Sequence, residues 1–290
     1  MAASVPIAPP SAQAQGCGQG MGAVLEPPVS ATNDEVYYRD GDSKIRMVVP
    51  PSGSTDVTTV PGNANVVSSF SVSPDDQRIA VLVEDLSAAT TIAERLYVED
   101  LRGGGHHADI YTTTVPKGKS ATTLWPMGWH QGRLVLGVWG ASTFEQALYP
   151  NAWHVVDATT ALRQASIGDA NCIASAWPSP AGVACFVHQA GQVRVYYWTG
   201  KLTTTLLSQT GAMNLSPSGD VLFAAVGGPD PATSVIGLDG RTSVVTPGHI
   251  GCVWVDDSHV LAFDAVISYP SGSVTALPQG LCAGRFPGGL

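Results

Sequence analysis

A hairpin pattern that recurs about every forty residues constrains this chain more than any other feature. Its clearest copy is Ser69–Asp85, which holds the turn Ser73–Asp76 between two runs of alternating apolar residues: Phe70 and Val72, then Ile79, Val81 and Val83. Period-two alternation on both sides of turn-forming residues predicts a β-hairpin. Related turns follow at 129–132, 178–182, 215–219, 255–258 and 285–289.

A second element lies between these hairpins and completes the repeat. It reads as a strand, a turn and a Thr/Ser-rich strand, clearest at 47–60, 196–207, 235–246 and 267–277 and weaker at 96–114 and 154–166. Each repeat therefore supplies four strands, which we name a to d in chain order. Four antiparallel strands per repeat are typical of one blade of a β-propeller.

Counting the repeats predicts six blades. Complete blades are expected at about 62–115, 120–168, 170–208, 210–246 and 248–277. This leaves strands b, c and d at 34–60 and one strand a at 279–286. Because an open ring exposes strand edges, we expect these ends to share a composite blade, with Cys282–Phe286 beside Glu35–Arg39. The predicted fold is an all-β, six-bladed propeller of four-stranded antiparallel blades, closed by N-terminal strands b-c-d plus the C-terminal strand a.

The composition agrees with many short strands and limits the classes of molecule that the protein is expected to bind. Charged residues make up 13% of the 290, against 32 Gly and 21 Pro. The formal net charge of −9 and the lack of a basic face argue against nucleic acid as a partner. No apolar run approaches the length of a transmembrane segment. We expect a single propeller domain over 33–290 that is a monomer.

The first 32 residues are expected to form a flexible leader rich in Pro, Ala and Gly. Ala12–Ala14 reads as the A-x-A end of a secretory signal whose charged and apolar parts are missing. This predicts an extracellular or periplasmic, secreted protein with an incomplete signal. A Pro/Ala linker without targeting meaning is one alternative, and a lipid-modified Cys17 is another.

Five cysteines favour an oxidising compartment, because no C-x-x-C motif is present. Cys252 and Cys282 each stand four positions before the turn residue of their repeats. They occupy equivalent places on neighbouring strands a, where blades converge, and are the disulfide candidates. Cys17 is a competing partner for either.

The turn residues also carry a family resemblance. Ser73-Pro74-Asp75-Asp76 followed by Ile79, and Ser216-Pro217-Ser218-Gly219 followed by Val221, resemble the TolB-like, WD40-like (PD40-type) propeller repeat, which usually reads S-P-D-G-x-x-I-A-F. The second Asp replaces Gly in the first copy, and Ser replaces Asp in the other. The resemblance implies an exported scaffold that holds proteins or ligands at one face. Because many activities occur on this fold, it does not specify a function.

Motifs that carry catalytic chemistry are missing from the sequence. It has no G-x-S-x-G, H-E-x-x-H or phosphate-loop pattern, and we assign no catalytic residue, metal ligand or cofactor. Adjacent His106 and His107 are expected to be solvated loop residues. The tryptophans are expected to pack between blades, with Trp139 as the exception.

The candidate binding face is the end where strands a begin. Connections d–a and b–c share that end, and they include the long segments Asp85–Glu94, Gly140–Asn151 and Gly227–Thr233. Loops on a rigid scaffold commonly carry recognition. The candidate binding residues on this face are Trp139, Phe144, Tyr149, His249, Asp169 and Asn171.

Two functions fit these observations. The first is a non-catalytic, exported scaffold that binds a protein, an extracellular polymer or a ligand. The alternative is a hydrolase or lyase with its site at the mouth of the central channel. A carboxylate within hydrogen-bond reach of His249 would favour the enzyme.

Overall fold

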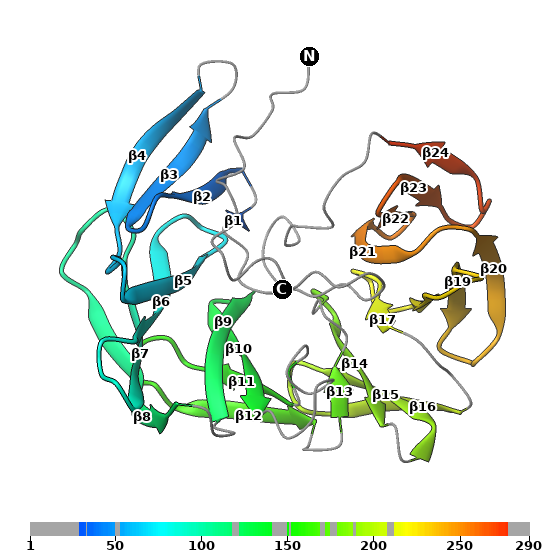
Figure 1. The fold of residues 1–290 in the computed structure, drawn as a ribbon. Helices are drawn as coiled ribbons and strands as arrows, with labels where there is room; N and C mark the ends of the chain where they lie inside the picture. Colours follow the sequence, from blue (N-terminus) through cyan, green and yellow to red (C-terminus); the bar gives the residue numbers. More distant parts are fainter. Residues whose placement is uncertain are drawn as a thin grey trace.

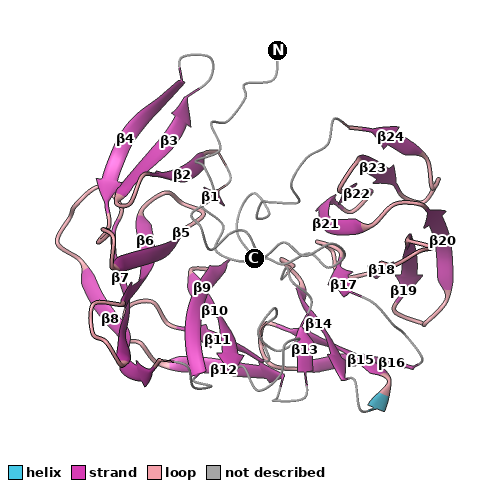
Figure 2. Cartoon of the chain, viewed as in Figure 1, coloured by secondary structure: helices cyan, strands magenta, loops and turns pink. Residues whose placement is uncertain are grey.

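Six four-stranded antiparallel sheets are arranged around a ring, as the computed structural model shows (Figure 1, Figure 2). The structure describes residues 29–32, 34–49, 53–117, 122–140, 150, 152–168, 172–174, 179–187, 190–207 and 212–277. Within each sheet the strands follow one another in chain order. The predicted all-β fold with six four-stranded blades is confirmed.

The first three blades are built from strands of very different lengths. Blade 1 contains β1 (Val29–Ala31), β2 (Val36–Asp40), β3 (Lys44–Val49) and β4 (Gly53–Thr59). Blade 2 contains β5 (Val66–Val72), β6 (Arg78–Asp85), β7 (Thr91–Asp100) and β8 (His107–Pro116). Blade 3 contains β9 (Thr122–His130), β10 (Arg133–Gly140), β11 (Ala152–Val156) and β12 (Arg163–Gly168).

The last three blades repeat the same order. Blade 4 contains β13 (Cys172–Ala174), β14 (Gly182–Val187), β15 (Gln192–Tyr197) and β16 (Leu202–Leu207). Blade 5 contains β17 (Ala212–Leu215), β18 (Val221–Val226), β19 (Ala232–Gly237) and β20 (Thr242–Pro247). Blade 6 contains β21 (Gly251–Asp256), β22 (His259–Ala262), β23 (Ala265–Ser268) and β24 (Val274–Ala276).

The inner edge of blade 1 requires a correction to the predicted closure. Val29–Ala31 pairs with Val36–Tyr38 in an antiparallel hairpin, so β1 takes the place expected for Cys282–Phe286. The short connection is closed by Thr32, whose backbone N–H donates to the Glu35 carbonyl at 2.9 Å. A local hairpin costs much less loop-closure entropy than a strand recruited from the far end of the chain. Each blade is therefore built from one continuous segment.

The predicted hairpin at Ser69–Asp85 is confirmed, and its turn explains a departure from the usual repeat. Asp76 takes φ 57°, and Gly219 takes φ 82° at the equivalent position of blade 5. This left-handed region normally favours glycine. Asp76 also accepts a hydrogen bond from the Tyr37 hydroxyl at 2.9 Å, so its side chain links blade 2 to blade 1.

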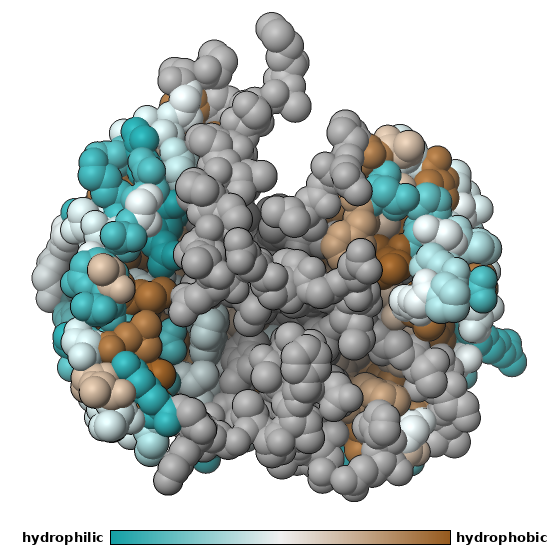
Figure 3. All heavy atoms as spheres, viewed as in Figure 1, coloured by the Kyte–Doolittle hydropathy of each residue, from teal (hydrophilic) through white to brown (hydrophobic). Residues whose placement is uncertain are grey.

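Large aromatic residues fill the spaces between blades, as expected from the sequence. Trp129, Trp153 and Trp254 are each at most 1% exposed. Trp129 Nε1 donates to the Ser71 carbonyl of blade 2 at 3.2 Å, and Trp254 Nε1 donates to the Asn214 carbonyl of blade 5 at 3.0 Å. On the face drawn in Figure 3, hydrophilic residues are frequent along the left rim, and a hydrophobic patch lies inward of them. Packing between blades therefore forms the core.

Candidate functional site

A histidine and an aspartate meet at the end of blade 6 where the innermost strand begins. His249 lies between β20 and β21, and Asp264 lies in the turn between β22 and β23. In an antiparallel blade these two connections share one end, which we call the entry face. His249 Nδ1 and Asp264 Oδ1 are 2.9 Å apart, with side chains 26% and 53% exposed. The pair is accessible at the entry face.

The backbone of His249 is held by a buried hydroxyl. Thr233 of β19 is 1% exposed, and its Oγ1 donates to the His249 carbonyl at 2.8 Å. The same oxygen accepts the Gly251 N–H at 2.7 Å. Blade 5 thus anchors the connection into β21. With Nδ1 facing a carboxylate, Nε2 of the imidazole is the nitrogen left to meet a ligand or a proton.

For the other predicted binding residues, the structure gives only the backbone position of Trp139, and their role stays a prediction. Trp139 lies in β10, where it pairs with Thr123 of β9 near the entry face. Phe144, Tyr149, Asp169 and Asn171 lie outside the described residues, as does the side chain of Trp139. Trp139 and His249 stand on blades 3 and 6 of the ring (Figure 1). The described residues therefore do not bring them together into one site.

A buried carboxyl group near the entry face was not among the predicted residues. Glu94 in β7 is 3% exposed and faces blade 3, because it shares a side of the strand with Leu96 and Val98. Burial raises the pKa of the Glu94 carboxyl, and the nearby Thr123 hydroxyl offsets part of that rise. Glu84 of β6 pairs directly with it across the sheet. Alternation along Glu94, Leu96 and Val98 is the sequence signal that indicates this burial.

Replacement of Glu94 by glutamine is expected to raise the melting temperature at about pH 8 and to leave it unchanged at about pH 4. The pKa of Glu94 is higher in the folded chain than in the unfolded chain. The folded state therefore binds more protons between the two pKa values, and stability falls as the pH rises through them. Glutamine removes that loss.

Thermal unfolding across this pH range, with Glu99→Gln as a control, measures the effect of Glu94. Glu99 lies in the same strand and its side chain is 31% exposed. If Glu94→Gln shows the same dependence of melting temperature on pH as the unmodified chain, Glu94 is not the group that lowers stability as the pH rises.

The expectation of two histidines in a solvated loop was wrong for His107. His107 begins β8, directly after His106, and stacks on Tyr97 with ring centroids 5.0 Å apart. Its ring also lies within 3.5 Å of Glu99 and Asp109. Among the described residues, no group of three or more His, Cys, Asp or Glu residues is arranged to hold a metal ion.

The cysteines are described only in part. Cys252 in β21 is 9% exposed. Cys252 and Cys185 each take part in a disulfide bond. Cys282 lies outside the described residues, so its pairing with Cys252 stays a prediction.

Comparisons with known proteins identify the architecture. No protein-family model and no curated protein matches this sequence. A chain of the crystal structure of the mitotic checkpoint complex is 13% identical with a TM-score of 0.53, over 92% of this chain and 85% of that one. The C-terminal WD40 domain of Sif2 is 13% identical with a TM-score of 0.50, over 90% and 76%.

The chain is a six-bladed β-propeller. A prolyl endopeptidase also matches, with 13% identity and a TM-score of 0.50, over 77% of this chain and 35% of that one. This propeller therefore spans about a third of that enzyme's length. Sequence identities this low show a shared fold only, and no activity is inferred from them.

Proposed function

We propose that this propeller is a non-catalytic, exported scaffold that binds a protein or an extracellular polymer at its entry face. The length of one connection carries the proposal: 11 residues join β10 to β11 at the entry face. Long connections on a rigid scaffold commonly carry recognition. The same face presents the His249–Asp264 pair. A second such pair, His259 Nδ1 with Asp256 Oδ1 at 2.9 Å, lies at the opposite end, so the pair alone does not distinguish the two faces.

Aromatic anchors are assigned to the loop that follows β10. Trp139 is the next-to-last residue of that strand, and Phe144 and Tyr149 follow it in the sequence. Rigid aromatic side chains supply large contact areas at low entropic cost and dominate many interfaces. Asp169, Asn171 and His249 add polar contacts in this proposal. A matching fold occurs in the mitotic checkpoint complex, which is itself an assembly.

A location outside the cytoplasm, in the periplasm or the extracellular space, is part of the same proposal. It rests on the signal-like segment at Ala12–Ala14 and on the cysteine content. In the part of the chain that is described, no helix is long and apolar enough to cross a membrane.

A hydrolase or lyase is the second candidate, and one observation favours it. The 2.9 Å contact between His249 Nδ1 and Asp264 Oδ1 is the arrangement that orients a histidine as a general base. Within the described residues, no serine or cysteine side chain bonds to this histidine. The binding scaffold is therefore the better-supported reading.

The binding test uses an alanine variant on each end of the same blade. Tyr149→Ala at the entry face is expected to weaken partner capture from a periplasmic or culture-fluid extract by about 2 kcal/mol, or roughly thirty-fold, without changing the melting temperature. Leu162→Ala is the matched control, because Leu162 is 65% exposed in the turn between β11 and β12 at the opposite end. Loss of capture only in Leu162→Ala would show that the binding face lies at the end opposite the entry face, and would contradict the proposal.

A further inference from the structure

A buried carboxylate oxygen lies at the boundary between blades 2 and 3, near the entry face. It is Oε2 of Glu94, a β7 residue that is 3% exposed and faces blade 3. Within the described part of the chain, no group hydrogen-bonds to this atom. The nearby Oγ1 of Thr123 in β9 is buried without a partner in the same way. Because buried polar atoms normally have partners, these two oxygens together indicate a ligand at this point.

The neighbours of Glu94 within its sheet bring more oxygen atoms to the same place. Glu84 of β6 stands directly opposite Glu94 on one side, and Thr113 of β8 stands directly opposite it on the other. Residues that are directly opposite point to the same face of a sheet, with Cβ atoms about 5 Å apart. Both neighbours are half-buried. Two carboxyl groups and two hydroxyls, with Thr123 included, therefore line this boundary.

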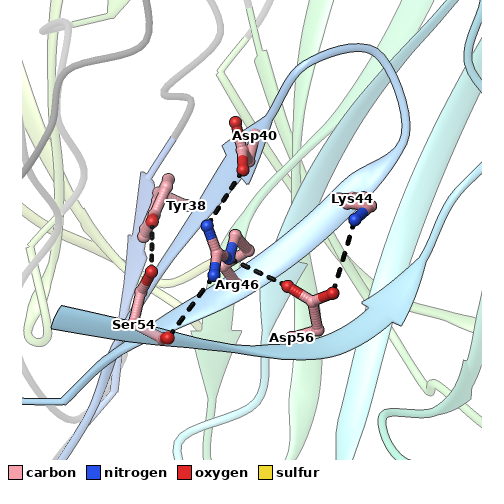
Figure 4. A network of polar contacts seen from close by, with 6 residues as sticks. All are labelled: Tyr38, Asp40, Lys44, Arg46, Ser54 and Asp56. Atoms are coloured by element: carbon pink, nitrogen blue, oxygen red, sulfur yellow. Dashed lines mark hydrogen bonds and ion pairs between the residues drawn. The ribbon is translucent and has the colours of Figure 1, made fainter.

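Blade 1 shows how carboxylates are neutralised elsewhere in this chain. Asp56 of β4 stands directly opposite Arg46 of β3, and the two side chains are in contact at 2.9 Å (Figure 4). Arg46 also contacts Asp40 at 3.1 Å, and Lys44 contacts Asp56 at 3.5 Å. Glu94 instead has a carboxylate directly opposite it, and no lysine or arginine among the described residues bonds to it. Two facing carboxylates destabilise a sheet unless a positive charge or a proton joins them.

The chemistry of the four side chains selects the kind of positive charge. All of them offer oxygen, and oxygen ligands suit Ca²⁺ and Mg²⁺ better than Zn²⁺ or Cu²⁺. Mg²⁺ usually keeps several of its water molecules, whereas Ca²⁺ accepts about six to eight oxygens in a flexible arrangement. The set contains two acidic residues, so it is distinct from the larger groups of His, Cys, Asp or Glu that the described residues lack. A partly buried set of protein oxygens favours Ca²⁺.

We propose that the carboxylates of Glu84 and Glu94 bind a calcium ion between blades 2 and 3. The hydroxyls of Thr113 and Thr123 act as further ligands, and water completes the coordination. Thr123 pairs with Trp139, so the bound ion ties β7 to the two strands that lead into the long connection after β10. The inference concerns a metal site and is independent of the proposed binding function.

Calorimetric titration of the calcium-free full chain with CaCl2 at about pH 8 tests this proposal. One ion is expected to bind, with a Kd of about 0.1–1 mM, the range of extracellular calcium modules. CaCl2 at about ten times this Kd is expected to raise the melting temperature by about 3 °C. NaCl at the same ionic strength is expected to give no such rise.

Glutamine variants assign the response to the site. Glu94→Gln keeps the size of the side chain and removes its charge, so it is expected to weaken binding at least ten-fold and to abolish the rise in melting temperature. Glu84→Gln is expected to do the same. Glu99→Gln is the matched control and is expected to keep both responses, because Glu99 lies on the other side of the same strand.

Three results would overturn the proposal. The first is the absence of binding heat and of any rise in melting temperature in the unmodified chain, which would mean that water or a proton satisfies Glu94. The second is equal calcium binding in Glu94→Gln and the unmodified chain, which would place the ion elsewhere. The third is an equal rise in melting temperature with NaCl, which would show charge screening only.

Discussion

Replacement of Trp254 by alanine is expected to lower the free energy of unfolding by about 3–5 kcal/mol, because a large buried side chain is lost and a cavity remains. Trp254 is 1% exposed and lies between blades 5 and 6. Its ring stands 5.9 Å from Phe223 and 6.4 Å from Tyr269 between centroids, and its Nε1 donates to the Asn214 carbonyl. This one side chain therefore joins two blades through both packing and a hydrogen bond.

Chemical denaturation of Trp254→Ala beside Val255→Ala measures this effect. Val255 is the next residue of β21 and is 50% exposed, so its truncation should change stability by no more than about 0.5 kcal/mol. Equal losses in the two variants would mean that the contact between blades 5 and 6 does not support the ring.

Removal of β1 is expected to have a comparable effect at the other end of the ring. A chain that starts at Thr32 lacks the partner of Val36–Tyr38 and leaves that strand edge open. It also lacks the Ser30 Oγ that accepts the Val72 N–H at 3.0 Å and links blade 1 to blade 2. At about 1 kcal/mol for each lost hydrogen bond, the cost is about 3 kcal/mol or more, together with aggregation.

The comparison for this prediction is a chain that starts at Val29 and keeps β1. Melting curves and light scattering at matched concentration distinguish the two chains. If the chain starting at Thr32 melts as the longer one does and stays monodisperse, β1 is not needed to complete blade 1.

Much of the fold follows from local patterns in the sequence. Phe70, Val72, Ile79 and Val81 alternate across a turn, and this pattern alone predicts the β5–β6 hairpin that the structure contains. The closure was predicted wrongly because β1 is only three residues long and has no alternation to mark it. The residues around Phe286 have the spacing of a repeat turn, so the inner strand of this blade was assigned to Cys282–Phe286 instead. A three-residue strand depends on its neighbour for stability and leaves little trace in the sequence.

The candidate site was less predictable than the fold. His249 was expected at the entry face, but Asp264 was missed because it lies in a short turn with no motif around it. Glu94 was placed in a loop, although β7 begins at Thr91 and buries it. Contacts between residues that lie far apart in a chain depend on blade register, and register was only approximate in the sequence repeats.

Site-specific photo-crosslinking tests the central claim, which is recognition at the entry face, most directly. A photoreactive aromatic residue is placed at position 149 in one chain and at position 162 in another, and each is irradiated in the same periplasmic or culture-fluid extract. The account predicts a covalent adduct with one partner from position 149 and none from position 162. An adduct from position 162 alone, or from neither position while the unmodified chain still captures its partner, would contradict it.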